Sequence, residues 1–179
     1  MAKVFLSYDR DDTERARPVA LALEKAGHAV WWDLHIRGGE QYTKVIDEAL
    51  KAADAVVVLW SKYSVESAWV RDEAAAGRDT GRLVPAALDG TDPPLGFRQF
   101  QTIDLSQWRG RGKPSELKTL LADVEAMVTT LVAIGISPPV MPRWNRVTSR
   151  LAGTGMVVPP VGCRGPYKMK REISSAWSK

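Results

Sequence analysis

The sequence has very little of what disulfides and metal sites need. Cysteine occurs once, as Cys163, and histidine occurs twice, so we expect neither an internal disulfide nor a cysteine–histidine metal cluster. No apolar run approaches the roughly 20 residues that span a bilayer. The N-terminal residues turn polar too early for a secretory signal. We therefore expect a cytoplasmic chain with no transmembrane segment and no bound metal.

Several familiar catalytic motifs are missing as well. There is no P-loop, and no Gly-x-Gly-x-x-Gly follows the first apolar segment. A Ser/His/Asp hydrolase would have to use His28 or His35, and no Gly-x-Ser-x-Gly is present. A response regulator needs a phosphate-accepting aspartate at the end of its third strand, where this chain has Trp60 and Ser61. These classes are excluded.

Positive charge is scarce outside the C-terminal part of the chain. The net charge is +4, but eight Lys or Arg and one Glu lie from Ser137 onward, leaving 17 basic and 20 acidic residues in 1–136. The N-terminal part therefore gives no electrostatic indication of nucleic-acid binding. We expect one domain over 1–134. Residues 135–179 form a basic tail containing Pro and Gly, which we expect to be irregular or disordered and solvated rather than bound to an anionic partner.

Short apolar segments alternate with amphipathic ones along residues 3–133. Strands are predicted at 3–7, 28–33, 55–60, 82–88 and 102–105. The intervening patterns predict helices that end at Gly27, cover about 41–52, follow Ser61 and Ser64, and cover 114–133. Repeated β-α units imply an α/β fold with a parallel sheet between two helical layers. We infer a flavodoxin-like three-layer fold with a five-stranded sheet in the order 2-1-3-4-5.

Two prolines qualify this prediction. Asp11, Asp12 or Thr13 can cap the first helix, but Pro18 is tolerated best in a first turn, so the regular helix is expected to begin later. Pro85 favours a strand position at which no ladder donor is needed.

The stretch 54–77 holds the most informative pattern. Residues 55–60 are continuously apolar, which is typical of a strand buried on both faces of a parallel sheet. The following helix carries Trp69 and Glu73, four residues apart and hence on one face. Ligands bind at the carboxyl ends of such strands, so this face is a candidate site. Without further support, a core tryptophan beside a solvated glutamate is the more typical interpretation of this pair.

Three segments in the right order resemble the Toll/interleukin-1 receptor (TIR) domain, particularly its bacterial form. Residues 4–8 are similar to the family's first box, and 33–42 to its loop after the second strand. Residues 67–73 fit its Ser-x-Trp-x-x-x-Glu helix motif. The stretches 93–97 and 104–105 also resemble bacterial members. The resemblance covers about residues 3–133.

The resemblance implies one of two functions. Some TIR domains cleave the nicotinamide–ribose bond of NAD+, giving nicotinamide and ADP-ribose or a cyclic ADP-ribose, whereas others are non-catalytic scaffolds that bind further TIR domains. In the enzymes the motif glutamate is catalytic, which here is Glu73. NAD+ is then the substrate and no cofactor is expected. The expected setting is bacterial defence or host-interaction signalling.

The resemblance also implies a set of substrate-binding residues around Glu73. Ser67 either binds ribose or caps the helix, Asp9 stands where many relatives have arginine, and Arg37 is either a ligand contact or simply exposed. The glycine loop of one copy often completes the site of its neighbour, so self-association is expected. The full set is Trp69, Ser67, Tyr8, Asp9, Arg10, Arg37, Gly39 and Tyr42.

Overall fold

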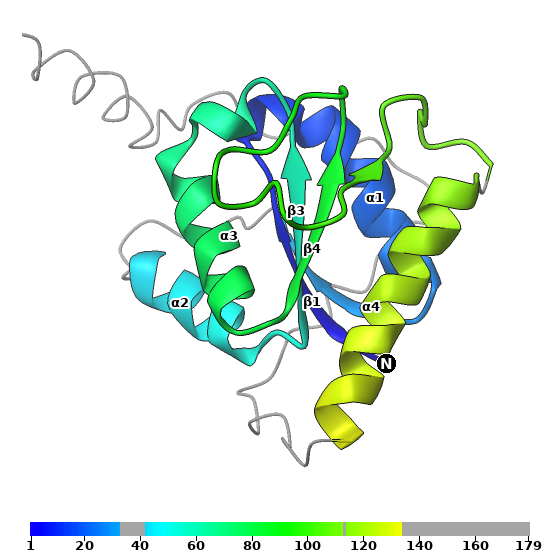
Figure 1. Ribbon diagram of the computed structural model, residues 1–179. Helices are drawn as coiled ribbons and strands as arrows, with labels where there is room; N and C mark the ends of the chain where they lie inside the picture. The colour runs from blue at the N-terminus through cyan, green and yellow to red at the C-terminus, as the bar shows by residue number, and fades with distance from the viewer. Residues whose placement is uncertain (33–41, 113, 134–179) are drawn as a thin grey trace, which may run out of the picture. The chain divides into compact units, whose positions relative to one another are not determined.

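The structure, a computed structural model, describes residues 1–32, 42–112 and 114–133 (Figure 1). Within these residues, five parallel strands form one sheet in the order β2-β1-β3-β4-β5. This confirms the predicted flavodoxin-like order. The strands are β1 (Lys3–Ser7), β2 (Ala29–Trp31), β3 (Ala55–Trp60), β4 (Leu83–Ala87) and β5 (Ile103–Asp104).

Helices cover both faces of the sheet (Figure 1). Those in the described part of the chain are α1 (Thr13–Lys25), α2 (Tyr42–Ala52), α3 (Ala68–Asp79) and α4 (Ser115–Ala133), together with the short 3-10 turns η1 (Arg10–Asp12) and η2 (Ser64–Glu66). Helices α1 and α4 pack on one face, and α2 and α3 pack on the other. The result is the predicted three-layer arrangement.

Strand β3 is the centre of the core. All six of its residues are buried, as the unbroken apolar run predicted. Because side chains alternate across a strand, Val57 and Leu59 join the cluster with α1 and α4, whereas Val58 and Trp60 join the cluster with α2 and α3. Burying large apolar side chains contributes about 1.5–3 kcal/mol each, which fixes this strand between the two helical layers.

The prediction of a late start for the first helix is wrong. Helix α1 begins at Thr13 and contains Pro18 in its interior. Proline lacks one backbone donor, which costs roughly 3 kcal/mol inside a helix. The apolar stripe of α1 is fully buried against the sheet, and this burial outweighs the lost bond; the stripe consists of Ala16, Val19, Ala20 and Leu23. The helix ends as predicted, with Gly27 at a φ of 93°.

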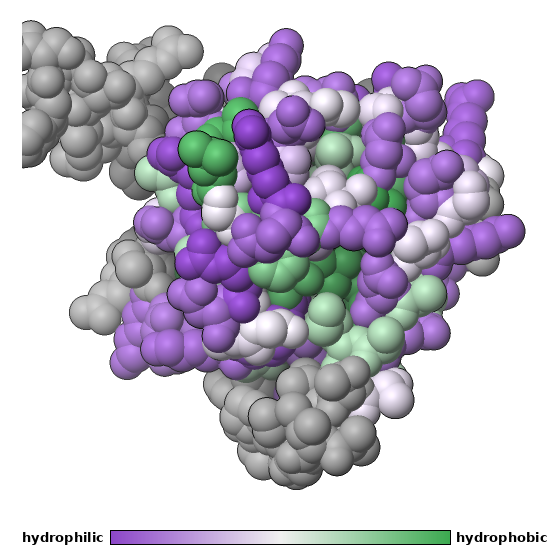
Figure 2. Space-filling model, in the orientation of Figure 1, coloured by the Kyte–Doolittle hydropathy of each residue, from purple (hydrophilic) through white to green (hydrophobic). Residues whose placement is uncertain are grey.

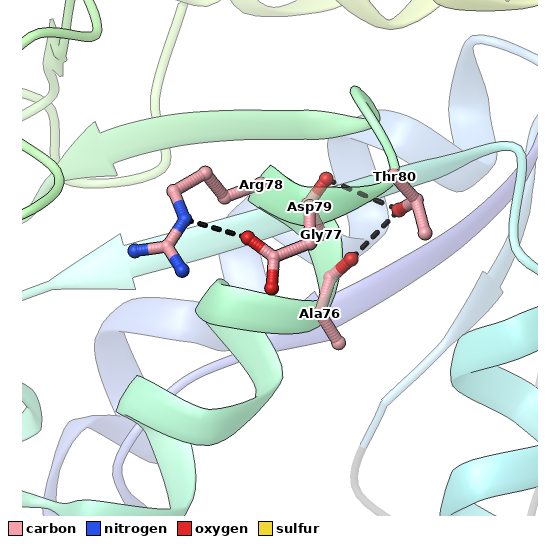
Figure 3. Close-up of polar contacts among 5 residues, drawn as sticks. All are labelled: Ala76, Gly77, Arg78, Asp79 and Thr80. Atoms are coloured by element: carbon pink, nitrogen blue, oxygen red, sulfur yellow. Dashed lines mark hydrogen bonds and ion pairs between the residues drawn. The ribbon is translucent and has the colours of Figure 1, made fainter.

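Helix α3 lies very close to the sheet at its C-terminal end. A Cβ atom on Gly77 would lie 2.9 Å from the Cβ of Val56, so only glycine allows this approach. Figure 3 shows how the helix ends just beyond this point: the Thr80 hydroxyl donates to the carbonyl oxygens of Ala76 (2.7 Å) and Gly77 (3.2 Å). The exposed Arg78–Asp79 ion pair beside it adds little. Helix α3 is therefore fixed against β3.

The edge of the sheet explains how Pro85 is accommodated. Strand β5 pairs only with Ala86 and Ala87, so Pro85 lies before that ladder begins. The predicted tail, from residue 135, lies outside the described residues. No helix in the described part of the chain is long and apolar enough to cross a membrane.

Candidate active site

Glu73 is a buried acidic residue on α3. The residue is only 8% exposed and lies on the buried face of the helix. Burying a carboxylate is costly unless hydrogen bonds compensate it, so its partners decide what it can do. The helix places it one turn after Trp69, as the four-residue spacing predicted.

The partner of Glu73 comes from the first strand. The hydroxyl of Ser7 donates a hydrogen bond of 2.6 Å to Oε2 of Glu73, and Ser7 is itself only 2% exposed. Ser7 is the last residue of β1, and it is in register with Val58 of β3. The Glu73 carboxylate therefore lies at the carboxyl end of the sheet, the edge at which ligands bind in this type of fold. Sequence reasoning did not single out Ser7.

Trp69 and Ser67 lie at the start of α3. Trp69 is partly buried and packs against the apolar cluster between the sheet, α2 and α3, so one part of the indole is in the core and another part reaches solvent. Ser67 occupies the N-cap position, with extended backbone, but its side chain makes no capping hydrogen bond. Of the two interpretations of Ser67, the capping one is therefore not realised.

The three residues after β1 lie near the same edge but have different surroundings. Tyr8 packs against the core cluster on the α1 and α4 side, whereas Ser7 and Glu73 join β1 to α3. The Asp9 carboxylate accepts the backbone N–H of Asp11 at 3.0 Å and thereby caps η1. Arg10 is exposed. The structure thus adds Ser7 to the residues that contact Glu73 at this edge.

The remaining predicted residues belong to the glycine loop. Arg37 and Gly39 lie outside the described residues. Tyr42 is the first residue of α2, but its side chain is not described. Their roles stay predictions.

A second buried carboxylate lies at the same edge, on the α1 side. Asp12 is 6% exposed and accepts a hydrogen bond from the hydroxyl of Ser61, the residue that follows β3. The Ser61 Oγ also accepts the backbone N–H groups of Tyr63 and Ser64, at 3.1 Å each. Burial raises the pKa of the Asp12 carboxyl, and the hydrogen bond from Ser61 opposes that rise. Asp12 and Ser61 together close the turns that follow β1 and β3.

Two hollows occur elsewhere on the described surface. One, of about 70 Å³, lies between α1 and the loop after β5, where Arg15 donates to the backbone carbonyls of Leu88, Leu105 and Ser106. The other, of about 170 Å³, lies between β4 and α4. Figure 2 shows apolar side chains at the surface between α3 and α4, over β4. Glu73 lines neither of these two hollows.

His28 is far from this site along the strand direction. It precedes β2 at the amino end of the sheet, where its Nδ1 accepts the backbone N–H of Ala2 at 3.3 Å. Burial lowers the pKa of its imidazole, which favours the neutral form, although Glu125 opposes that shift. Within the described ranges, no three His, Cys, Asp or Glu residues are grouped as metal ligands would be. The chemical group available at the carboxyl end of the sheet is therefore the buried Glu73 carboxylate, which Ser7 holds by a hydrogen bond.

The fold and this site define a flavodoxin-like α/β domain with an acidic residue at the ligand-binding edge. A family model described as the TIR domain matches residues 4–121, which is more than half of the chain. The chain belongs to the TIR-domain family. The resemblance of the three sequence segments is thereby confirmed.

Comparison with other proteins adds little beyond the family. No curated protein matches the chain. A 2-deoxyribosyltransferase from the psychrotolerant bacterium Bacillus psychrosaccharolyticus has 16% identity and a TM-score of 0.48, covering 66% of this chain and 96% of that one. The TIR domains of the activated Roq1 resistosome, which directly recognises the pathogen effector XopQ, have 21% identity and a TM-score of 0.43, covering 75% of each chain.

Proposed function

We propose that this TIR domain is an NAD+ nucleosidase that cleaves the nicotinamide–ribose bond, with Glu73 as its catalytic residue. The observation that carries the proposal is the position of the Glu73 carboxylate. It is buried, it accepts a hydrogen bond from Ser7, and it lies at the carboxyl end of the parallel sheet. A family in which some members use this glutamate catalytically gives the buried Glu73 carboxylate a role.

The chemistry needs one carboxylate rather than two. Most glycosidases use a second carboxyl group to protonate the leaving group. In NAD+ the leaving nicotinamide is a cationic pyridinium, so it takes the electron pair of the broken C–N bond and departs neutral without an added proton. Positive charge develops on the ribose, and a water molecule then adds to the same carbon and loses its proton. For the cyclic product, a nitrogen of the adenine takes the place of the water.

Glu73 would act on the ribose in this scheme. Its negative charge stabilises the developing sugar cation, and its oxygens accept hydrogen bonds from ribose hydroxyls. Trp69, with its partly exposed indole one helical turn away, would form a wall beside the nicotinamide and limit the access of water. Such electrostatic stabilisation works best where water is excluded, which suits a residue that is only 8% exposed.

The decisive experiment measures release of nicotinamide from NAD+ by the purified full chain. We expect release by the wild-type protein, including at high concentration or when the protein is clustered on a support. Glu73→Ala and Glu73→Gln are expected to lower the rate by ~10²-fold or more, because each removes the charge that stabilises the sugar cation. Chromatography of the other product separates ADP-ribose from a cyclic form.

Glu66 provides a matched control. It lies seven residues before Glu73, in η2, and is exposed, so Glu66→Gln removes the same charge without touching the site. We expect this variant to keep the wild-type rate. Equal turnover by wild type and Glu73→Gln would refute the role of the carboxylate. No release by wild type under any of these conditions would leave the alternative, a non-catalytic module that binds other TIR domains.

We also propose that the active form is self-associated through TIR–TIR contacts. The family resemblance supports this, because the glycine loop of one copy often completes the site of its neighbour. Light scattering during size-exclusion chromatography, combined with activity at increasing protein concentration, tests it. A strictly monomeric protein with full activity at every concentration would contradict it.

A further inference from the structure

We infer that Ser7 is a positioning residue for the reaction: its hydroxyl fixes one oxygen of the Glu73 carboxylate and favours the charged form of that carboxylate. The inference rests on the proposed function. The inference goes beyond that function by naming a second residue. Ser7 does not act on the substrate, but it affects the charge and the orientation of Glu73, which does.

The geometry of the contact carries the inference. The Ser7 Oγ to Glu73 Oε2 distance is 2.6 Å, which is typical of a hydrogen bond from a hydroxyl to a charged oxygen. Both side chains are buried, at 2% and 8% exposure, so water competes little for either group. Hydrogen bonds to charged groups in such surroundings are among the strong ones.

The two residues differ in how firmly their own backbones and side chains are held. Ser7 ends β1, which is paired with β2 on one side and β3 on the other, so its backbone is fixed. Its side chain has a single torsion between heavy atoms, χ1. Glu73 has three side-chain torsions, and a hydrogen bond from a fixed donor removes most of that freedom. Catalytic groups need positions accurate to fractions of an ångström, and the strand end provides that reference point.

The same bond affects the protonation of the carboxyl group. A hydrogen bond donated to a carboxylate favours the charged form, whereas burial favours the neutral form. Only the charged form stabilises a sugar cation. Without Ser7, burial acts unopposed by this donor, so a larger share of the enzyme holds a protonated, inactive Glu73 at a given pH.

The test compares wild type with Ser7→Ala over a pH series. Alanine removes the donor without adding volume, so the variant is expected to fold. We expect a loss of about tenfold or more in kcat/KM at the low-pH end. We also expect the acid limb of the pH–rate profile to move to higher pH, because the charged carboxylate loses a hydrogen-bond donor, so that the deficit shrinks as the pH rises. A merely structural loss would lower the rate by the same factor at every pH.

Ser64→Ala is the matched control. Ser64 is fully buried, and its hydroxyl bonds the backbone of Ser61 rather than Glu73. The exchange therefore deletes an equally buried serine hydroxyl near the same sheet edge. We expect it to lower the thermal midpoint without moving the acid limb. Titration of the Glu73 carboxyl by carbon NMR in wild type and Ser7→Ala provides a second measurement that does not depend on turnover, and its midpoint is expected to move up in the variant.

The possible failures are distinguishable. If wild type releases nicotinamide, Glu73→Gln does not, and Ser7→Ala matches wild type in both rate and acid limb, the role of Ser7 is overturned and the proposed function stands. If wild type itself releases no nicotinamide, the proposed function fails and the inference fails with it. An acid limb that moves equally in Ser7→Ala and Ser64→Ala also overturns it, because the effect would then belong to any buried serine.

Discussion

Two serine–carboxylate pairs lie at the carboxyl edge of the sheet. In one pair the serine comes from β1 and the carboxylate from a segment after β3, and in the other pair the origins are reversed. Ser7 at the end of β1 holds Glu73 of α3, the helix after β3, whereas Ser61 after β3 holds Asp12 in the turn after β1. In each pair one carboxylate and one hydroxyl, both buried, join β1 or the turn after it to a segment that follows β3. The sheet edge is therefore tied together twice, once on each side.

The surroundings of the two pairs differ. The Ser61 hydroxyl serves three partners, namely the carboxylate of Asp12 and the backbone N–H groups of Tyr63 and Ser64. Beside Glu73 stands the partly exposed indole of Trp69. Asp12 is part of a closed structural network, whereas Glu73 lies next to an aromatic surface that solvent can reach. The same chemical pair thus belongs to a closed network on one side, and on the other it holds the carboxylate to which we assign the proposed reaction.

Neutralising each carboxylate in turn tests this difference most strongly. Under the proposed function, Glu73→Gln is expected to lower nicotinamide release by ~10²-fold or more, because it removes the charge proposed to stabilise the sugar cation. Asp12→Asn is expected to leave the rate per folded molecule unchanged. Rates are measured on protein whose folded fraction is known from circular dichroism. A loss of the same size in both variants would show that the two carboxylates act together.

Removing each serine hydroxyl should affect stability unequally. Ser61→Ala leaves a buried carboxylate without its donor and two backbone N–H groups without an acceptor, so it is expected to lower the free energy of unfolding by ~1–3 kcal/mol. Ser7→Ala removes one hydrogen bond and is expected to cost less than this. Urea unfolding of both variants measures the difference. A larger loss in Ser7→Ala would reverse the assignment of the structural role.

Gly77→Ala should disturb the Glu73 side and leave the Asp12 side intact. The new Cβ would lie 2.9 Å from that of Val56, so α3 must move away from the sheet. Overpacking typically costs ~1–3 kcal/mol, and the better helix propensity of alanine returns about 1 kcal/mol. We expect a net loss of about 1 kcal/mol in urea unfolding and a lower rate of nicotinamide release. Unchanged stability and rate would show that α3 is not packed tightly against β3 at Gly77.

The smallest expected effect is in the pH dependence of stability. Burial raises the pKa of Asp12 above 3.8, helped by Asp9 and Asp89 and opposed by Ser61 and Arg15. The folded state thus keeps this proton to a higher pH than the unfolded state. The resulting stability is complete below 3.8 and is lost as the pH rises through the folded pKa.

Asp12→Asn removes this contribution. Unfolding in urea between about pH 4 and about pH 7 should therefore show wild type losing stability relative to the variant as the pH rises. Parallel curves for the two proteins would contradict the raised pKa and would weaken the contrast between the two pairs.

Much of the architecture could be predicted from local patterns. The unbroken apolar run of β3, the apolar stripe of α1 and the spacing of Trp69 and Glu73 follow from periods of two and 3.6 residues, and the structure confirms all three elements. The start of α1 could not be predicted in this way. Local propensity disfavours Pro18 in a helix interior, and only the burial of the neighbouring apolar residues overcomes it.

The partners of the candidate site could not be predicted either. Ser7 and Glu73 are 66 residues apart in the sequence, and Asp12 and Ser61 are 49 apart. A lone serine at a strand end carries no signal of its bonding partner. The strand order was the one available clue, because β1 and β3 had to be neighbours for either pair to form.

The sequence by itself determined which segments become strands and helices and that Trp69 and Glu73 share one face of α3, because those features depend on residue types and their spacing. The tertiary structure alone decided which carboxylate meets which hydroxyl and how deeply each is buried. Those properties depend on the packing of segments that are distant in the chain, and no local pattern records them.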